Sequence, residues 1–133
     1  MASRQNITFR ILFFLYLAGV LYLCFGHFEN TPSIELHFLG IPTDKLVHFG
    51  MFFPFPILAF LAFDQFTETV PQTLLFVGVT FAIGLLVAVG TEWGQATLTD
   101  YRSGDPWDFL ADTVGLTLSS VIAAWWDIRK QKK

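Results

Sequence analysis

Four long apolar segments constrain the fold of this chain more than any other feature. They cover about residues 7–26, 46–63, 73–92 and 108–126, and each is close to the ~20 residues that a helix needs to cross a bilayer. Helices are expected because lipid offers no hydrogen-bond partner to an unpaired backbone amide. With 53% hydrophobic and only 14% charged residues, a water-soluble globular domain is disfavoured. We therefore predict an all-α integral membrane protein, a four-transmembrane-helix bundle formed by one membrane domain over residues 1–133.

Two of these segments carry further signals. Pro54 and Pro56 lie inside the second segment, and because proline has no backbone N–H we expect a kink or a local break there. In the first segment, Arg4 and Arg10 precede the apolar stretch 11–26, so a cleavable signal peptide is an alternative to a retained span. No small-residue cleavage site follows the apolar run, which favours a retained span.

The basic residues predict the orientation of the helices. Six of the eight flank the first and last segments: Arg4, Arg10, Arg129, Lys130, Lys132 and Lys133. Because lysine and arginine gather on the cytoplasmic side, both termini are expected to be cytoplasmic, which requires an even number of spans. Trp93 and Trp107 would then lie at the outer interface, and Trp125 and Trp126 at the inner one, as interfacial tryptophans commonly do.

Polar residues gather at the ends of the segments that this orientation places outside. They are Asp44, His48, Glu92, Gln95, Arg102, Asp105, Asp108 and Asp112. Ionisable groups are costly near hydrocarbon, so a cluster of this size indicates function. We expect it to form a polar, mainly acidic pocket at the outer face.

Spacing groups the first of these residues. Asp44 and His48 are four residues apart, on one face of a helix, where the acid can hold the imidazole tautomer. A helix cap formed by Thr43 or Asp44 is the structural alternative. Glu92 is expected near a helix C-terminus, where the helix dipole disfavours a carboxylate, so it needs compensation from Arg102, His48 or a bound cation. This makes Glu92 the strongest single candidate.

The acids of the fourth segment are also periodic. Asp105 is a suitable N-cap before Pro106, and Asp108 lies in the first turn, where acids are favoured. Asp112 lies about 10 Å farther along the helix, below the interface. Spacings of three and four place the three acids on one stripe, which Gly115 continues where a neighbouring helix can approach closely. Gly90 and Gly94 are expected to allow a similar approach.

The motifs together resemble the VanZ-like family of small bacterial membrane proteins. They are residues 43–49 (TDKLVHF), 91–95 (TEWGQ) and 102–108 (RSGDPWD), with Asp112 and Gly115, and the resemblance covers about residues 43–118. The family is named for a protein associated with teicoplanin resistance. The resemblance implies a multi-pass protein of the bacterial cytoplasmic (inner) membrane, acting at the cell envelope, with the eight polar residues above as its matching positions. One departure is Asp112, where the family usually has asparagine.

The chemistry of the candidate residues leaves three functions open. The set offers five acids, one imidazole, one amide and one guanidinium, without an evident serine, cysteine or lysine nucleophile, which argues against a serine-type intramembrane protease. The first function is an enzyme acting on a lipid-linked or cell-envelope substrate. Its catalytic residues would be Asp44, His48, Glu92, Asp108 and Asp112, and its substrate-binding residues Gln95, Arg102 and Asp105. The set could also hold Mg²⁺, Mn²⁺ or Zn²⁺, although its spacing matches no metal signature.

The other two functions require no turnover. The protein could be a non-catalytic binder of a lipoglycopeptide or an envelope lipid, or the polar network could only fix helix register. A transporter is a weaker alternative because four spans leave little room for alternating access. Membrane lipids are the expected partners, whereas nucleic acid is not, since the basic residues form no face that could follow a phosphate backbone.

Overall fold

The computed structural model describes residues 4–25, 37–38, 41–98 and 106–132, and it forms a helical bundle. The helices are α1 (Arg4–Phe25), α2 (Thr43–Phe52), α3 (Pro54–Ala62), α4 (Val70–Leu98) and α5 (Pro106–Gln131), with a short 3-10 helix η1 (Asp64–Phe66). Two-residue strands β1 (His37–Phe38) and β2 (Ile41–Pro42) pair antiparallel before α2. Four stretches are long and apolar enough to cross a membrane, with α2 and α3 sharing one. The predicted all-α fold with four spans is confirmed.

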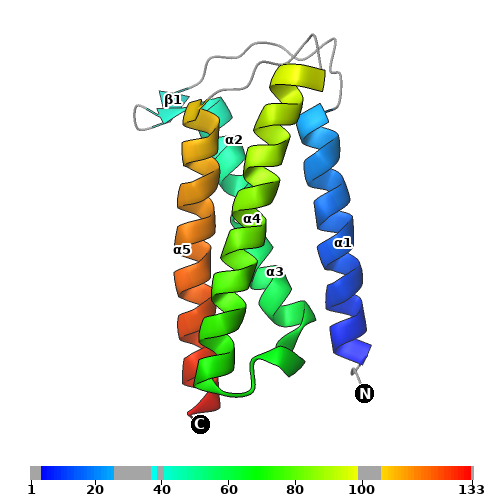
Figure 1. Ribbon diagram of the computed structural model, residues 1–133, viewed down its shortest axis with the longest axis vertical. Coiled ribbons are helices and arrows are strands. Elements are labelled where there is room, and N and C mark those ends of the chain that lie inside the picture. The colour runs from blue at the N-terminus through cyan, green and yellow to red at the C-terminus, as the bar shows by residue number, and fades with distance from the viewer. Residues whose placement is uncertain (1–3, 26–36, 39–40, 99–105, 133) are drawn as a thin grey trace.

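The bundle is arranged around α5. Helices α2, α3 and α4 all pack against α5, and α1 packs mainly against α3; Figure 1 shows α4 and α5 side by side, with α1 at the opposite edge. The start of α1 and the end of α5 lie at the same end of the bundle (Figure 1). This arrangement is the one expected for an even number of spans.

The second span is interrupted at Phe53, as its prolines predicted. Helix α2 ends at Phe52 and α3 begins with Pro54 at its first turn. The hydroxyl of Tyr16 on α1 donates a hydrogen bond to the carbonyl of Met51, in the last turn of α2. Tyr16 therefore ties α1 to the last turn of α2, beside the carbonyls of Gly50 and Phe52, whose usual helical donors are missing at Pro54 and Pro56.

The surface of the bundle is largely apolar. Leu75 and Leu86 are each 71% exposed and Val121 is 64% exposed, and similar side chains cover the outer faces of α1, α4 and α5. Exposed apolar surface on this scale is expected in lipid, not in water. The interior, by contrast, contains several polar side chains, among them His48, Gln95, Asp112, Ser119 and Asp127.

A polar cluster closes the end of the bundle where the termini lie. Asp127 of α5 is buried, and its carboxylate accepts hydrogen bonds from the hydroxyl of Thr73 at 2.5 Å and from the amide of Gln131 at 3.0 Å. Gln131 also donates to the carbonyl of Thr67 at 2.8 Å. These bonds join the last turns of α5 to the start of α4, and no sequence motif predicted them.

Candidate functional site

His48 lies at the centre of a buried polar cluster near the other end of the bundle. Its Nδ1 is 2.9 Å from Oδ1 of Asp112, and its Nε2 is 3.3 Å from Oδ2 of Asp108. Glu92 of α4 approaches from a third helix, with Oε1 3.7 Å from Nδ1. Lys45 completes the group, which we call the His48 centre (Lys45, His48, Glu92, Asp108 and Asp112). Three helices thus bring an imidazole and three carboxylates together.

Helix α5 contributes two acids because its periodicity places them on one face. Asp108 and Asp112 are both buried, and Asp112 is fully so. Gly115 continues the stripe: a Cβ there would lie 2.7 Å from the carbonyl oxygen of Phe49 on α2. The predicted close approach at Gly115 is confirmed, and it holds α5 near enough to α2 for both acids to reach His48.

Helix α4 differs from its predicted course. It continues to Leu98, so Glu92 lies more than one turn before its end rather than at the C-terminus. The helix dipole therefore disfavours the Glu92 carboxylate less than predicted, because the dipole acts mainly within the last turn. The Glu92 carboxylate instead lies beside the imidazole of His48, one of the partners predicted for it.

The glycine predictions for α4 were half right. A Cβ at Gly94 would lie 2.7 Å from the ring of Phe25, so α1 approaches closely there. At Gly90 a Cβ would meet nothing within 4 Å, so the expected close approach is wrong at that position. The difference arises because Gly90 is on an exposed face of α4, whereas Gly94 is buried.

The centre is chemically suited to proton transfer and to cation binding. A proton on Nδ1 forms a hydrogen bond to Asp112 and leaves the lone pair of Nε2 facing Asp108, so the acid fixes the tautomer of the imidazole. One ligand atom each from His48, Glu92 and Asp108 lies within 4.8 Å of the others, a spacing that could hold a metal ion.

Comparison with known proteins assigns the family. A family model described as VanZ/LLP1 matches residues 13–127, which include every member of the His48 centre. The chain belongs to the VanZ/LLP1 family. The resemblance seen in the sequence motifs is thereby confirmed. A search of curated proteins and a search of solved structures each found no match.

Several predicted site residues of this VanZ/LLP1 protein can be placed only in part. Asp44 lies in the first turn of α2, but its side chain is outside the described part of the structure, so its predicted pairing with His48 stays a prediction. Arg102 and Asp105 lie outside the described residues. Gln95 is buried, and its amide donates to the carbonyl of Cys24 at 2.8 Å, which ties α4 to α1.

Lys45 is the member of the centre that the sequence analysis missed. Its Nζ lies 2.5 Å from Oδ1 of Asp108, and both side chains are largely buried. The available signal was its position three residues before His48, which places both on one face of α2.

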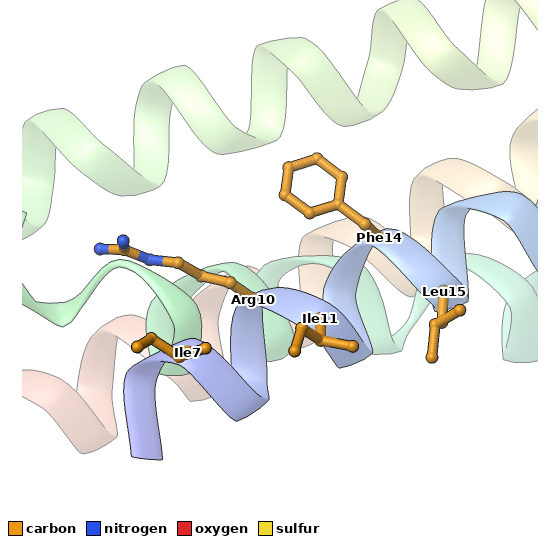
Figure 2. A pocket seen from close by; sticks show the side chains of 5 residues that line it. All are labelled: Ile7, Arg10, Ile11, Phe14 and Leu15. Atoms are coloured by element: carbon orange, nitrogen blue, oxygen red, sulfur yellow. The ribbon is translucent and has the colours of Figure 1, made fainter. Parts of the chain in front are cut away.

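Two apolar hollows differ in their relation to the centre. One of about 460 Å³ is lined by Lys45, Leu46, Phe49, Trp107, Leu110, Ala111 and Val114, so it adjoins the centre through Lys45. Figure 2 shows the other, of about 370 Å³, where Ile7, Ile11 and Leu15 follow one edge of α1 beside Arg10 and Phe14. The second lies at the opposite end of α1 from Cys24 and has no acid or imidazole in its lining, so it is not a candidate reaction site in this VanZ/LLP1 protein.

Proposed function

We propose that this protein is an enzyme that acts on an amphiphilic cell-envelope substrate, such as a lipid-linked precursor, at the outer half of the bacterial cytoplasmic membrane. The observation that carries the proposal is the His48 centre itself. An imidazole contacts two carboxylates at 2.9 and 3.3 Å, with a third at 3.7 Å. Burying these groups is costly, and such groups within spans commonly mark sites of chemistry.

The surroundings of the centre support an amphiphilic substrate. Lys45 belongs both to the centre and to the lining of the adjoining hollow, whose remaining wall is apolar. An alkyl chain can lie in that hollow while a polar or anionic head group reaches the centre. Arg102 and Asp105 are proposed to bind the head group, Asp44 to assist the catalytic residues, and Gln95 to hold α1 against α4.

The orientation and the physiological role belong to the same proposal. Both termini are cytoplasmic, which places the His48 centre near the outer surface. A substrate of the cell envelope connects this site with glycopeptide susceptibility, because teicoplanin resistance gave the family its name. A non-catalytic binder of lipoglycopeptide or envelope lipid is the alternative that the experiment below separates.

Glu92→Gln tests the proposed function. It keeps the size and polarity of the side chain but removes the carboxylate, so we expect conversion of the substrate to be lost. The measurement compares lipids and lipid-linked wall precursors by mass spectrometry, together with teicoplanin susceptibility, in cells that express the wild-type or variant protein. Asp127→Asn is the matched control, because it neutralises a buried acid at the opposite end of α5, and it should behave as wild type.

Each alternative predicts a different result. A binder would alter susceptibility without changing any lipid species, and Arg102→Ala would lower its affinity for the lipoglycopeptide. A purely structural network would leave both readouts of Glu92→Gln unchanged while the melting temperature fell. Either result would contradict the enzyme proposal.

A further inference from the structure

We propose that His48, Glu92 and Asp108 bind one divalent transition-metal ion, of the kind represented by Zn²⁺ and Mn²⁺. The proposal deepens the proposed function, on which it rests for the location of the chemistry, by naming the species that would activate the substrate. With the ion bound, these three side chains serve as ligands, and the ion supplies a Lewis acid at the centre.

The ligand atoms have the required spacing. The three residues come from α2, α4 and α5, and one donor atom of each lies within 4.8 Å of the others. Nε2 of His48 and Oδ2 of Asp108 are 3.3 Å apart. Bonds of about 2.0–2.2 Å to a shared ion place neighbouring ligand atoms about 3–4 Å apart. Oε1 of Glu92 lies 3.7 Å from Nδ1 of His48, so binding of the ion at Nε2 requires the Glu92 carboxylate to turn toward that nitrogen.

The orientation of His48 favours a cation between it and Asp108. Oδ1 of Asp112 lies 2.9 Å from Nδ1, so a proton on Nδ1 is satisfied there. Nε2 then presents a lone pair to Oδ2 of Asp108, and two acceptors at 3.3 Å repel unless a proton or a metal ion lies between them. Metal-ligating histidines characteristically donate their other ring N–H to a carboxylate, and Asp112 lies where it would accept such a bond from Nδ1.

An independent observation is the second oxygen of Asp112. The residue is fully buried, and its carboxylate faces His48 through Oδ1. Oδ2 has no hydrogen-bond partner among the residues that the structure describes. Buried polar atoms nearly always have a partner, so an unsatisfied one requires an explanation such as an ion or a water molecule. A water molecule held between the ion and Asp112 would satisfy this atom.

The donor set indicates which ions are suitable. One imidazole nitrogen and two carboxylate oxygens favour zinc, manganese or iron over calcium and magnesium, which prefer oxygen alone. Lys45 lies 2.5 Å from Oδ1 of Asp108 and leaves Oδ2 on the side of His48. The lysine thereby orients this carboxylate toward the ion and balances part of the negative charge of the centre.

The test measures binding by the full-length protein in lipid nanodiscs. After treatment with a chelator, Mn²⁺ or Zn²⁺ is titrated, and bound metal is quantified by elemental mass spectrometry and, for Mn²⁺, by electron paramagnetic resonance. We expect about one ion per chain and a rise in melting temperature on binding. Glu92→Gln and Asp108→Asn should each weaken binding at least about 10-fold, and Asp112→Asn, which alters the orienting partner, about 10-fold.

Asp127→Asn is the control, because it removes a buried carboxylate far from the centre and should bind like wild type. The helicity and the size-exclusion profile of the metal-free variants establish whether they are folded. We expect at least one of Glu92→Gln and Asp108→Asn to be folded by both measures. The absence of stoichiometric metal, or binding that both variants retain, would overturn the proposal and indicate a protonated His48 between its acids. If lipid conversion persists in chelator with no ion retained, the metal site is refuted while the proposed function stands.

Discussion

At the scale of single residues, the contact between Gly115 and Phe49 determines how α5 meets α2. A Cβ at position 115 would lie 2.7 Å from the carbonyl oxygen of Phe49 and 3.4 Å from the backbone nitrogen of Phe53. Backbone atoms cannot rotate away as a side chain can. Any larger residue would therefore separate the two helices that hold His48, Asp108 and Asp112.

We expect Gly115→Ala to destabilise the protein by about 1–3 kcal/mol, the usual range for overpacking a tight interface. The measurement is thermal unfolding of the purified protein in nanodiscs. Gly90→Ala is the control, because a Cβ there meets nothing within 4 Å, and alanine is the better helix former by up to about 1 kcal/mol. Equal melting temperatures for the two variants would contradict the close approach at Gly115.

The residues of the site were predictable to different degrees. His48, Glu92, Asp108 and Asp112 could be selected because ionisable groups are rare within apolar segments. The partner of Gln95 could not, since it is a backbone carbonyl of α1, and no sequence pattern records which carbonyl another helix will present.

Asp127 was passed over for a similar reason. It lies directly after the last apolar segment, next to basic residues, where an acid gives no signal of burial. Its burial depends on how the start of α4 folds against the end of α5.

At the scale of elements, the break between α2 and α3 separates the site from the remainder of the second span. The sequence predicted the break, because two prolines in one short segment remove two backbone donors. It did not predict Tyr16, whose hydroxyl reaches the carbonyl of Met51 from α1. This contact between two helices is a tertiary feature, whereas the break itself is local.

We expect Tyr16→Phe to lower stability by about 1–2 kcal/mol, because it removes the hydrogen bond but retains the ring within the bundle. Thermal unfolding in nanodiscs would measure the loss. Phe13→Leu is a useful comparison: it alters packing on the same helix, where Phe13 is buried against Phe55, without affecting a hydrogen bond. Amide hydrogen exchange near Met51 should increase in Tyr16→Phe and not in Phe13→Leu; the same exchange in both would argue against a role for the hydroxyl.

Helix boundaries were less predictable than helix existence. The third span was expected over residues 73–92, and α4 runs over Val70–Leu98. Hydropathy falls at Glu92, and this marked the expected end of the span. The helix nevertheless continues, because backbone hydrogen bonds do not depend on whether the side chains are apolar.

At the scale of the whole molecule, the bundle has two polar ends that face opposite sides of the membrane. The His48 centre lies near one end, and Asp127 with its hydroxyl and amide partners lies near the other. Composition and periodicity predicted four spans and one domain, and the basic residues predicted which end is cytoplasmic. The structure contains the four spans. The side of the membrane on which the termini lie can be measured directly.

Cysteine labelling can determine the orientation. In a Cys24→Ala background, which removes the single native cysteine, we expect Leu98→Cys to react with a membrane-impermeant maleimide in intact cells. Glu68→Cys should react only after the membrane is permeabilised. Both positions are exposed, so accessibility of the side chain does not limit either reaction. The reverse pattern would place the His48 centre on the cytoplasmic side.

The length of α4 has a consequence for where a lipid could meet the protein. Its 29 residues correspond to about 43 Å of helix, compared with ~30 Å of hydrocarbon in a typical bilayer. If the excess is divided between both leaflets, each end projects about 6 Å past the acyl chains, and Glu92, about 9 Å below the last residue, lies close to their upper limit. At this depth a phospholipid presents its glycerol and ester groups. These groups would therefore lie level with the Glu92 carboxylate while the acyl chains remained in the leaflet.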